Sequence, residues 1–132
     1  MPSYYKTLTN SRQDSIELKN IMEEIGNEVV CRSKGLDPQT KQQNTSQKPA
    51  DTSDYPGVLL GQIQSGKTRT FIGVIAYVFD YDFDITVVFT KNSTALVEQT
   101  VKRLKTDFSA PVNAGELFIF DVMKASSITK HT

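Results

Sequence analysis

The first regular hydrophobic pattern in the chain lies between residues 12 and 30. Apolar side chains recur there in steps of four, three and four, at Leu18, Met22, Ile25 and Val29. Because residues at this spacing share one face of a helix, the pattern predicts an amphipathic helix over about 12–30. Gly26 lowers the helical preference by up to about 1 kcal/mol relative to alanine, so a break or an early end there stays open. We expect this helix to pack on its own domain rather than on a partner.

A polar stretch follows, from Ser33 to Pro56. It contains almost no apolar side chain and several turn-forming residues. Such a composition offers little apolar surface to bury, so we interpret it as a linker or a mobile loop. The chain is thereby divided into an N-terminal helical segment (residues 1–32), this polar linker (33–56) and a second domain (57–132).

The pattern changes after Gly57. Residues 58–60 form a short apolar run that predicts a strand, and a loop bounded by glycines follows it. Apolar residues then occupy much of the helical circumference between Lys67 and Phe79, which predicts a helix with few solvent-facing positions. The order in this part of the chain is therefore strand, loop and helix.

Two further strands and one helix complete the predicted domain. Residues 84–90 are rich in β-branched and aromatic side chains and predict a buried strand, and residues 117–120 predict another. Between them, polar residues 92–94 can cap a helix whose inner face carries Val97, Val101, Leu104 and Phe108. Alternating strands and helices at this spacing predict an α/β fold, in which a parallel sheet lies between layers of helices.

Composition and charge narrow the function classes. The 132 residues have room for one modest domain, and 15 basic residues balance 15 acidic ones, so no overall field favours nucleic acid or an anionic membrane. The single cysteine, Cys31, excludes an internal disulfide and suits a reducing compartment. The start lacks a signal pattern, and the longest apolar run, residues 71–79, is too short to span a bilayer. We expect a soluble, cytoplasmic protein without a membrane partner.

Candidate chemistry is concentrated between Gly61 and Thr68. The segment Gly-Gln-Ile-Gln-Ser-Gly-Lys-Thr has the spacing of a phosphate-binding loop, and it follows a predicted strand and opens a predicted helix. The glycines let backbone N–H groups turn toward phosphate oxygens, and the helix N-terminus adds the positive end of its dipole. Lys67 can reach the β and γ phosphates, while the Thr68 hydroxyl can ligate magnesium.

The sequence therefore predicts a site for ATP and Mg²⁺. Lys67 is the candidate catalytic residue and Thr68 the candidate metal ligand. The residues predicted to contact the nucleotide are Gly61, Gln62, Gln64, Ser65, Gly66, Lys67, Thr68 and Arg69.

This loop, followed one predicted strand later by the stretch from Thr90 to Gln99, resembles the first RecA-like domain of superfamily-two DEAD/DEAH-type helicase-like ATPases. The Gln-Ser-Gly-Lys-Thr form is similar to that of such ATPases in bacterial restriction and phage-defence systems. The resemblance implies a partial three-layer P-loop domain with a RecA-like parallel sheet and an N-terminal helix. It also implies that residues 61–68 are motif I. Residues 90–99 would be motif Ia, which contacts nucleic acid, so DNA is an expected partner. From the residues alone, backbone contact and plain helix capping by 90–94 stay equally open.

The resemblance ends near Phe120. The family's next motif is an apolar strand ending in Asp-Glu, whereas here Asp121 is followed by Val122. We favour Asp121 as the end of an intervening strand over a metal-binding carboxylate. The groups that activate water and stabilise the γ-phosphoryl group are missing, and we expect the rest of a longer chain or a partner to supply them.

Two other functions stay open. A small P-loop phosphotransferase would use Asp121 as its metal carboxylate, but such enzymes need several arginines, and only Arg69 and Arg103 follow the loop. A non-catalytic nucleotide-binding interaction module would bind without turnover. The alternating aspartates Asp80, Asp82 and Asp84 lack the glycine of a calcium loop and are expected to lie in a solvated loop.

Overall fold

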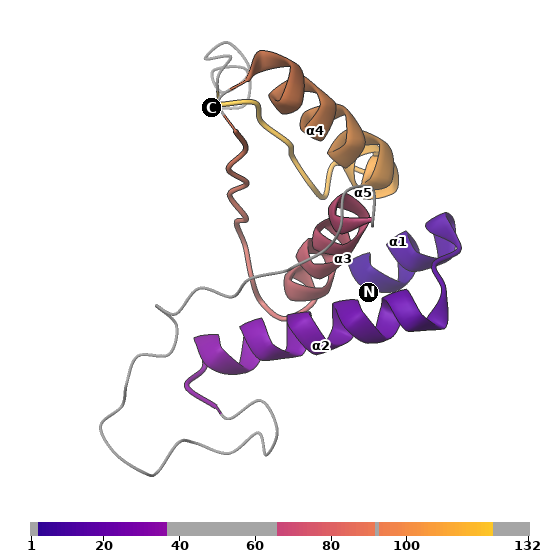
Figure 1. Cartoon of the computed structure of the whole chain (residues 1–132), viewed down its shortest axis with the longest axis vertical. Helices are drawn as coiled ribbons and strands as arrows, with labels where there is room; N and C mark the ends of the chain where they lie inside the picture. Colours follow the sequence, from indigo (N-terminus) through magenta and orange to yellow (C-terminus); the bar gives the residue numbers. More distant parts are fainter. Residues whose placement is uncertain (1–2, 37–65, 92, 123–132) are drawn as a thin grey trace. The chain divides into compact units, whose positions relative to one another are not determined.

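The computed structural model describes residues 3–36, 66–91 and 93–122, and these contain five helices (Figure 1). The chain divides into two compact units, Met1–Ile85 and Thr86–Thr132. The first unit contains α1 (Tyr4–Arg12), α2 (Ile16–Ser33) and α3 (Lys67–Phe79). The second contains α4 (Thr94–Asp107) and α5 (Ser109–Asn113).

The helix predicted over about 12–30 is α2, and a further helix, α1, precedes it. Gln13 ends α1 in the left-handed conformation at φ 55°, and Ser15 starts α2 by accepting a hydrogen bond from the Leu18 N–H. Gly26 does not interrupt α2, which continues to Ser33. The prediction located α2 but missed α1, whose buried residues are only Tyr5, Leu8 and Thr9.

Helices α2 and α3 cross closely enough to require glycine on each side. A Cβ atom on Gly73 of α3 would overlap the Met22 sulfur of α2, and one on Gly26 of α2 would overlap the Tyr77 ring of α3. Each glycine thus provides the space that a large side chain of the other helix fills. This packing offsets the low helical preference of Gly26.

The C-terminal end of α3 is joined to the start of α1. The Asp80 carboxylate accepts hydrogen bonds from the Tyr4 and Tyr5 N–H groups at 2.8 and 3.2 Å, and from the Ser3 hydroxyl. A carboxylate at this position satisfies backbone donors that have no partner within the helix and interacts favourably with the helix dipole. The prediction of a solvated loop is confirmed for Asp80, which is exposed in the turn after α3, but the contact of its carboxylate with α1 was not predicted.

The predicted α/β fold with a parallel sheet is wrong for the described residues, which contain no sheet. Residues 84–90 and 117–120 form no strands, and Ile85 and Phe89 are 79% and 91% exposed. Helices α1 and α2, rather than a sheet, cover α3. A β-prone segment becomes a strand only when a neighbour pairs its backbone, and no such pairing occurs among these residues. The strand predicted at 58–60 lies outside the described residues.

The second unit confirms a predicted helix but buries little of it. Helix α4 has the predicted inner face, yet Val97, Val101 and Leu104 are only half-buried, and Phe108 alone is fully buried among the described residues of this unit. In neither unit does a described helix combine the length and the apolar character needed to cross a bilayer.

Candidate functional site

The last residues of the predicted phosphate loop form the start of α3. Gly66 is the N-cap residue and has φ 84°, a left-handed conformation that favours glycine. A Cβ atom at Gly66 would meet nothing within 4 Å, so the requirement is conformational rather than steric. The Thr70 N–H and hydroxyl both donate to the Gly66 carbonyl at 3.0 Å, which fixes the first turn of the helix. The predicted site residues Gly61, Gln62, Gln64 and Ser65 lie outside the described residues.

Lys67 and Thr68 occupy the exposed first turn of α3. The helix begins at Lys67 as predicted, and its N-cap contributes no side-chain hydrogen bond. The first turn also contains no acidic residue. The N–H groups of this turn and the dipole of the helix therefore provide a positive end that suits an anion.

Arg69, the next predicted nucleotide contact, extends toward the turn between α1 and α2. Its Nε donates to Asp14 Oδ1 at 2.7 Å, and its terminal nitrogen donates to the Arg12 carbonyl at 2.6 Å. The Arg69 side chain is 37% exposed. Arg69 therefore contacts the turn between α1 and α2, whereas Lys67 and Thr68 of the same helical turn are exposed.

Asp14 accepts hydrogen bonds from two arginines. Arg12 donates to Asp14 Oδ2 from Nε at 3.1 Å and from a terminal nitrogen at 2.6 Å. The other terminal nitrogen of Arg12 donates to the Arg69 carbonyl at 2.9 Å. We call these three residues the Asp14 cluster. Sequence reasoning missed it, because no local pattern pairs residue 14 with residue 69.

The stretch predicted to contact DNA has an incompletely capped helix start. Ser93 is the N-cap of α4, and its side chain makes no capping hydrogen bond. The Thr90 hydroxyl donates to the Lys91 carbonyl at 3.2 Å, and Lys91 is exposed. Asn92 lies outside the described residues.

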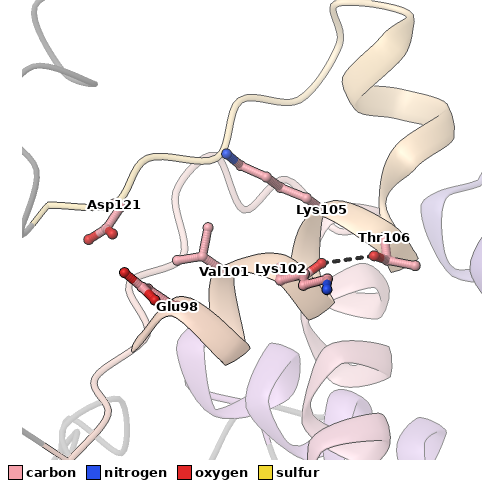
Figure 2. Close-up of a pocket in the computed structure, with 6 residues that line it drawn as sticks. All are labelled: Glu98, Val101, Lys102, Lys105, Thr106 and Asp121. Atoms are coloured by element: carbon pink, nitrogen blue, oxygen red, sulfur yellow. Dashed lines mark hydrogen bonds between the residues drawn. The ribbon is translucent and has the colours of Figure 1, made fainter. Parts of the chain in front are cut away.

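Asp121 lines a hollow beside α4 rather than ending a strand. Figure 2 shows its carboxylate and that of Glu98 on one side of the hollow, with Lys105 and Lys102 farther along the helix. Val101 and Thr106 complete the lining. Within the described ranges, no group of three or more potential metal-binding side chains is present, so Asp121 has no such set around it.

Comparisons with protein-family models, with curated proteins and with solved structures find no match to this chain.

Proposed function

We propose that residues 61–68 bind the phosphates of ATP together with Mg²⁺. The observation that carries the proposal is the left-handed Gly66 leading directly into an exposed helix start at Lys67. Lys67 would neutralise the β and γ phosphates, and Thr68 would offer its hydroxyl to the magnesium ion. The motif and the helix start agree, because a phosphate-binding loop needs a helix N-terminus immediately after its glycine.

We further propose that this chain is the ATP-binding part of a helicase-like, nucleic-acid-dependent ATPase in the cytoplasm. Support for this identity comes from the two sequence motifs, and the Ser93 N-cap, whose side chain makes no capping bond, supports phosphate contact at 90–99. Binding without efficient hydrolysis is expected of these residues, because Asp121 is followed by Val122 and not by the glutamate that would orient water. The remaining catalytic groups would come from elsewhere in a longer chain or from a partner.

The phosphotransferase alternative is disfavoured by the Asp14 cluster. Such an enzyme needs arginines around the transferred phosphoryl group, and Arg69 is engaged by Asp14 and by the Arg12 carbonyl. A non-catalytic nucleotide-binding module would share the same phosphate site.

Calorimetric titration with ATP and Mg²⁺ tests the proposal. Lys67→Ala is expected to weaken binding at least about tenfold, since a charge-assisted contact contributes about 1.5–3 kcal/mol. Thr68→Ala should weaken binding in the presence of magnesium and change it little without the metal. Lys6→Ala, at an exposed position of α1, is the matched control for the lost charge. Equal affinity in wild type and Lys67→Ala, or no binding to folded wild type, would refute the proposal.

A further inference from the structure

We infer that Asp14 is a positioning residue for the phosphate site, acting through Arg69 on the first turn of α3. This inference rests on the proposed function and deepens it, because it assigns the N-terminal helices a role in nucleotide affinity. Asp14 belongs to the turn between α1 and α2, and its carboxylate reaches α3 through Arg69.

The Asp14 carboxylate is fully buried and paired with two arginines. Its side chain is 0% exposed, and each oxygen is used, Oδ1 by Arg69 and Oδ2 by Arg12. The Arg12 side chain is itself only 7% exposed. Since a buried carboxylate is costly unless it is paired and hydrogen-bonded, the geometry of both arginines is tied to Asp14.

The two arginines also exchange hydrogen bonds with each other's backbone. Arg12 donates to the Arg69 carbonyl, and Arg69 donates to the Arg12 carbonyl, at 2.9 and 2.6 Å. The cluster therefore holds the main chain of α3 as well as a side chain. Thr68 immediately precedes Arg69, so any rotation of this turn would redirect the Thr68 hydroxyl and the Lys67 amine.

The position of Asp14 is fixed by the helices on either side of it. Its N–H donates to the Thr9 carbonyl at 3.1 Å, and Ser15 begins α2 directly afterwards. Arg12 additionally contacts the Met22 sulfur at 3.5 Å, next to the close crossing at Gly73. The cluster thus transmits the packing of α1 and α2 to the start of α3.

Coupling between the cluster and the phosphate site is reciprocal. If Asp14 orients the first turn for phosphate, then bound phosphate must stabilise the packing of α1 and α2 on α3 by the same free energy.

The test compares the two ends of α3 in the full chain. Asp14→Asn and Arg69→Gln disrupt the cluster, while Asp80→Asn removes a carboxylate from the other end of this 13-residue helix, roughly 20 Å away. Residues that orient a metal ligand, as Arg69 would orient Thr68, typically change metal affinity or activity by about 10–100-fold when removed. We expect Asp14→Asn and Arg69→Gln to weaken the binding of ATP with Mg²⁺ by about tenfold or more in calorimetry, and Asp80→Asn to stay within about twofold of wild type.

Amide hydrogen exchange without nucleotide supplies a second readout. Asp14→Asn should accelerate exchange at Thr70 to Gly73 more than at Val78 to Tyr81, and ATP with Mg²⁺ should slow exchange in α1 and α2 of wild type. Arg69→Gln leaves Asp14 paired with Arg12, so it decides the question if Asp14→Asn does not fold.

The outcomes separate the two proposals. Tight binding by Asp14→Asn and Arg69→Gln, with binding lost in Lys67→Ala, would overturn the positioning role and leave the phosphate site standing. Equal losses in Asp14→Asn and Asp80→Asn would also overturn it, because general destabilisation would then explain both. No binding by folded wild type would overturn the proposed function and the positioning role together.

Discussion

The two units bury their helices to very different degrees. Helices α1, α2 and α3 each contain buried residues, and Leu8, Met22 and Ile72 are at most 2% exposed. Helices α4 and α5 contain no buried residue. Among the described residues of the second unit, only Phe108, which lies between these helices, is buried. The difference shows that an amphipathic pattern specifies a helix without specifying what covers it.

The first unit achieves its burial by complementary shapes and by charged contacts at both ends of α3. Glycines at the crossing let a methionine and a tyrosine fill the space between two helices. Asp14 holds one end of α3, and Asp80 holds the other against α1. This arrangement places the candidate phosphate site on the better packed of the two units.

The largest expected contrast is between core truncations in the two units. Met22→Ala should destabilise the first unit by about 2–5 kcal/mol, the usual loss for a fully buried large side chain, whereas Leu104→Ala should cost clearly less because Leu104 is half-buried. Urea unfolding followed by far-ultraviolet circular dichroism measures both variants, and tyrosine fluorescence reports on the first unit, since all five tyrosines precede residue 86 and the chain has no tryptophan. Equal losses for the two variants would contradict the comparison.

Alkaline pH should weaken the first unit selectively. Burial raises the pKa of the Tyr5 and Tyr77 hydroxyls, with Glu23 raising that of Tyr5 further and the hydrogen bond to Tyr81 raising that of Tyr77. The protonated hydroxyls are thus favoured in the folded state, so their stabilisation is complete below about pH 10 and declines above it, by at most about 1.4 kcal/mol per pH unit for each group.

Urea midpoints measured between pH 8 and 11 check this expectation. Tyr77→Phe should reduce the loss of stability above pH 10. An identical pH profile in Tyr77→Phe and wild type would show that this hydroxyl does not contribute.

Removal of the contact between Asp80 and the start of α1 should reduce the stability of the first unit by a smaller amount. Asp80→Asn weakens the cap on α1, and capping losses are typically about 0.5–2 kcal/mol. Asp82→Asn is the matched control, because Asp82 is exposed and its φ of 68° is tolerated by asparagine. Of the two substitutions, only Asp80→Asn should lower the melting temperature, as measured by circular dichroism during thermal unfolding. A similar shift in both variants would argue against the cap.

The smallest effect is expected in the second unit. Phe89→Ser should change the free energy of unfolding by no more than about 0.5 kcal/mol, because the Phe89 side chain is 91% exposed. Urea unfolding followed by far-ultraviolet circular dichroism measures this. A loss of 2 kcal/mol or more would show that residues 84–90 are buried in the folded protein, as the sequence predicts for a strand.

The sequence predicted the helices better than it predicted strands or the packing between elements. The helix predicted from Lys67 to Phe79 is confirmed by α3, and the helix predicted after residues 92–94 is confirmed by α4. Both patterns are local, because helical hydrogen bonds join residues four apart. Strand formation depends on a distant partner, and the apolar residues at 84–90 and 117–120 could not identify one.

The candidate site shows the same division. The loop motif predicted a helix start after Gly66, and the structure has one there. The roles of Asp14 and Asp80 could not be predicted, because each depends on a contact across more than 50 residues of sequence. Arg69 illustrates the point, since its sequence neighbours predicted a nucleotide contact while its side chain meets Asp14.

The most direct test of the central claim is a titration of ¹⁵N-labelled protein with ATP and Mg²⁺, followed by amide chemical shifts. Phosphate binding at the helix start predicts the largest changes at the amides of Gly66 to Arg69, and their loss in Lys67→Ala. Unchanged shifts at these four residues, or changes confined to α4, would contradict the account.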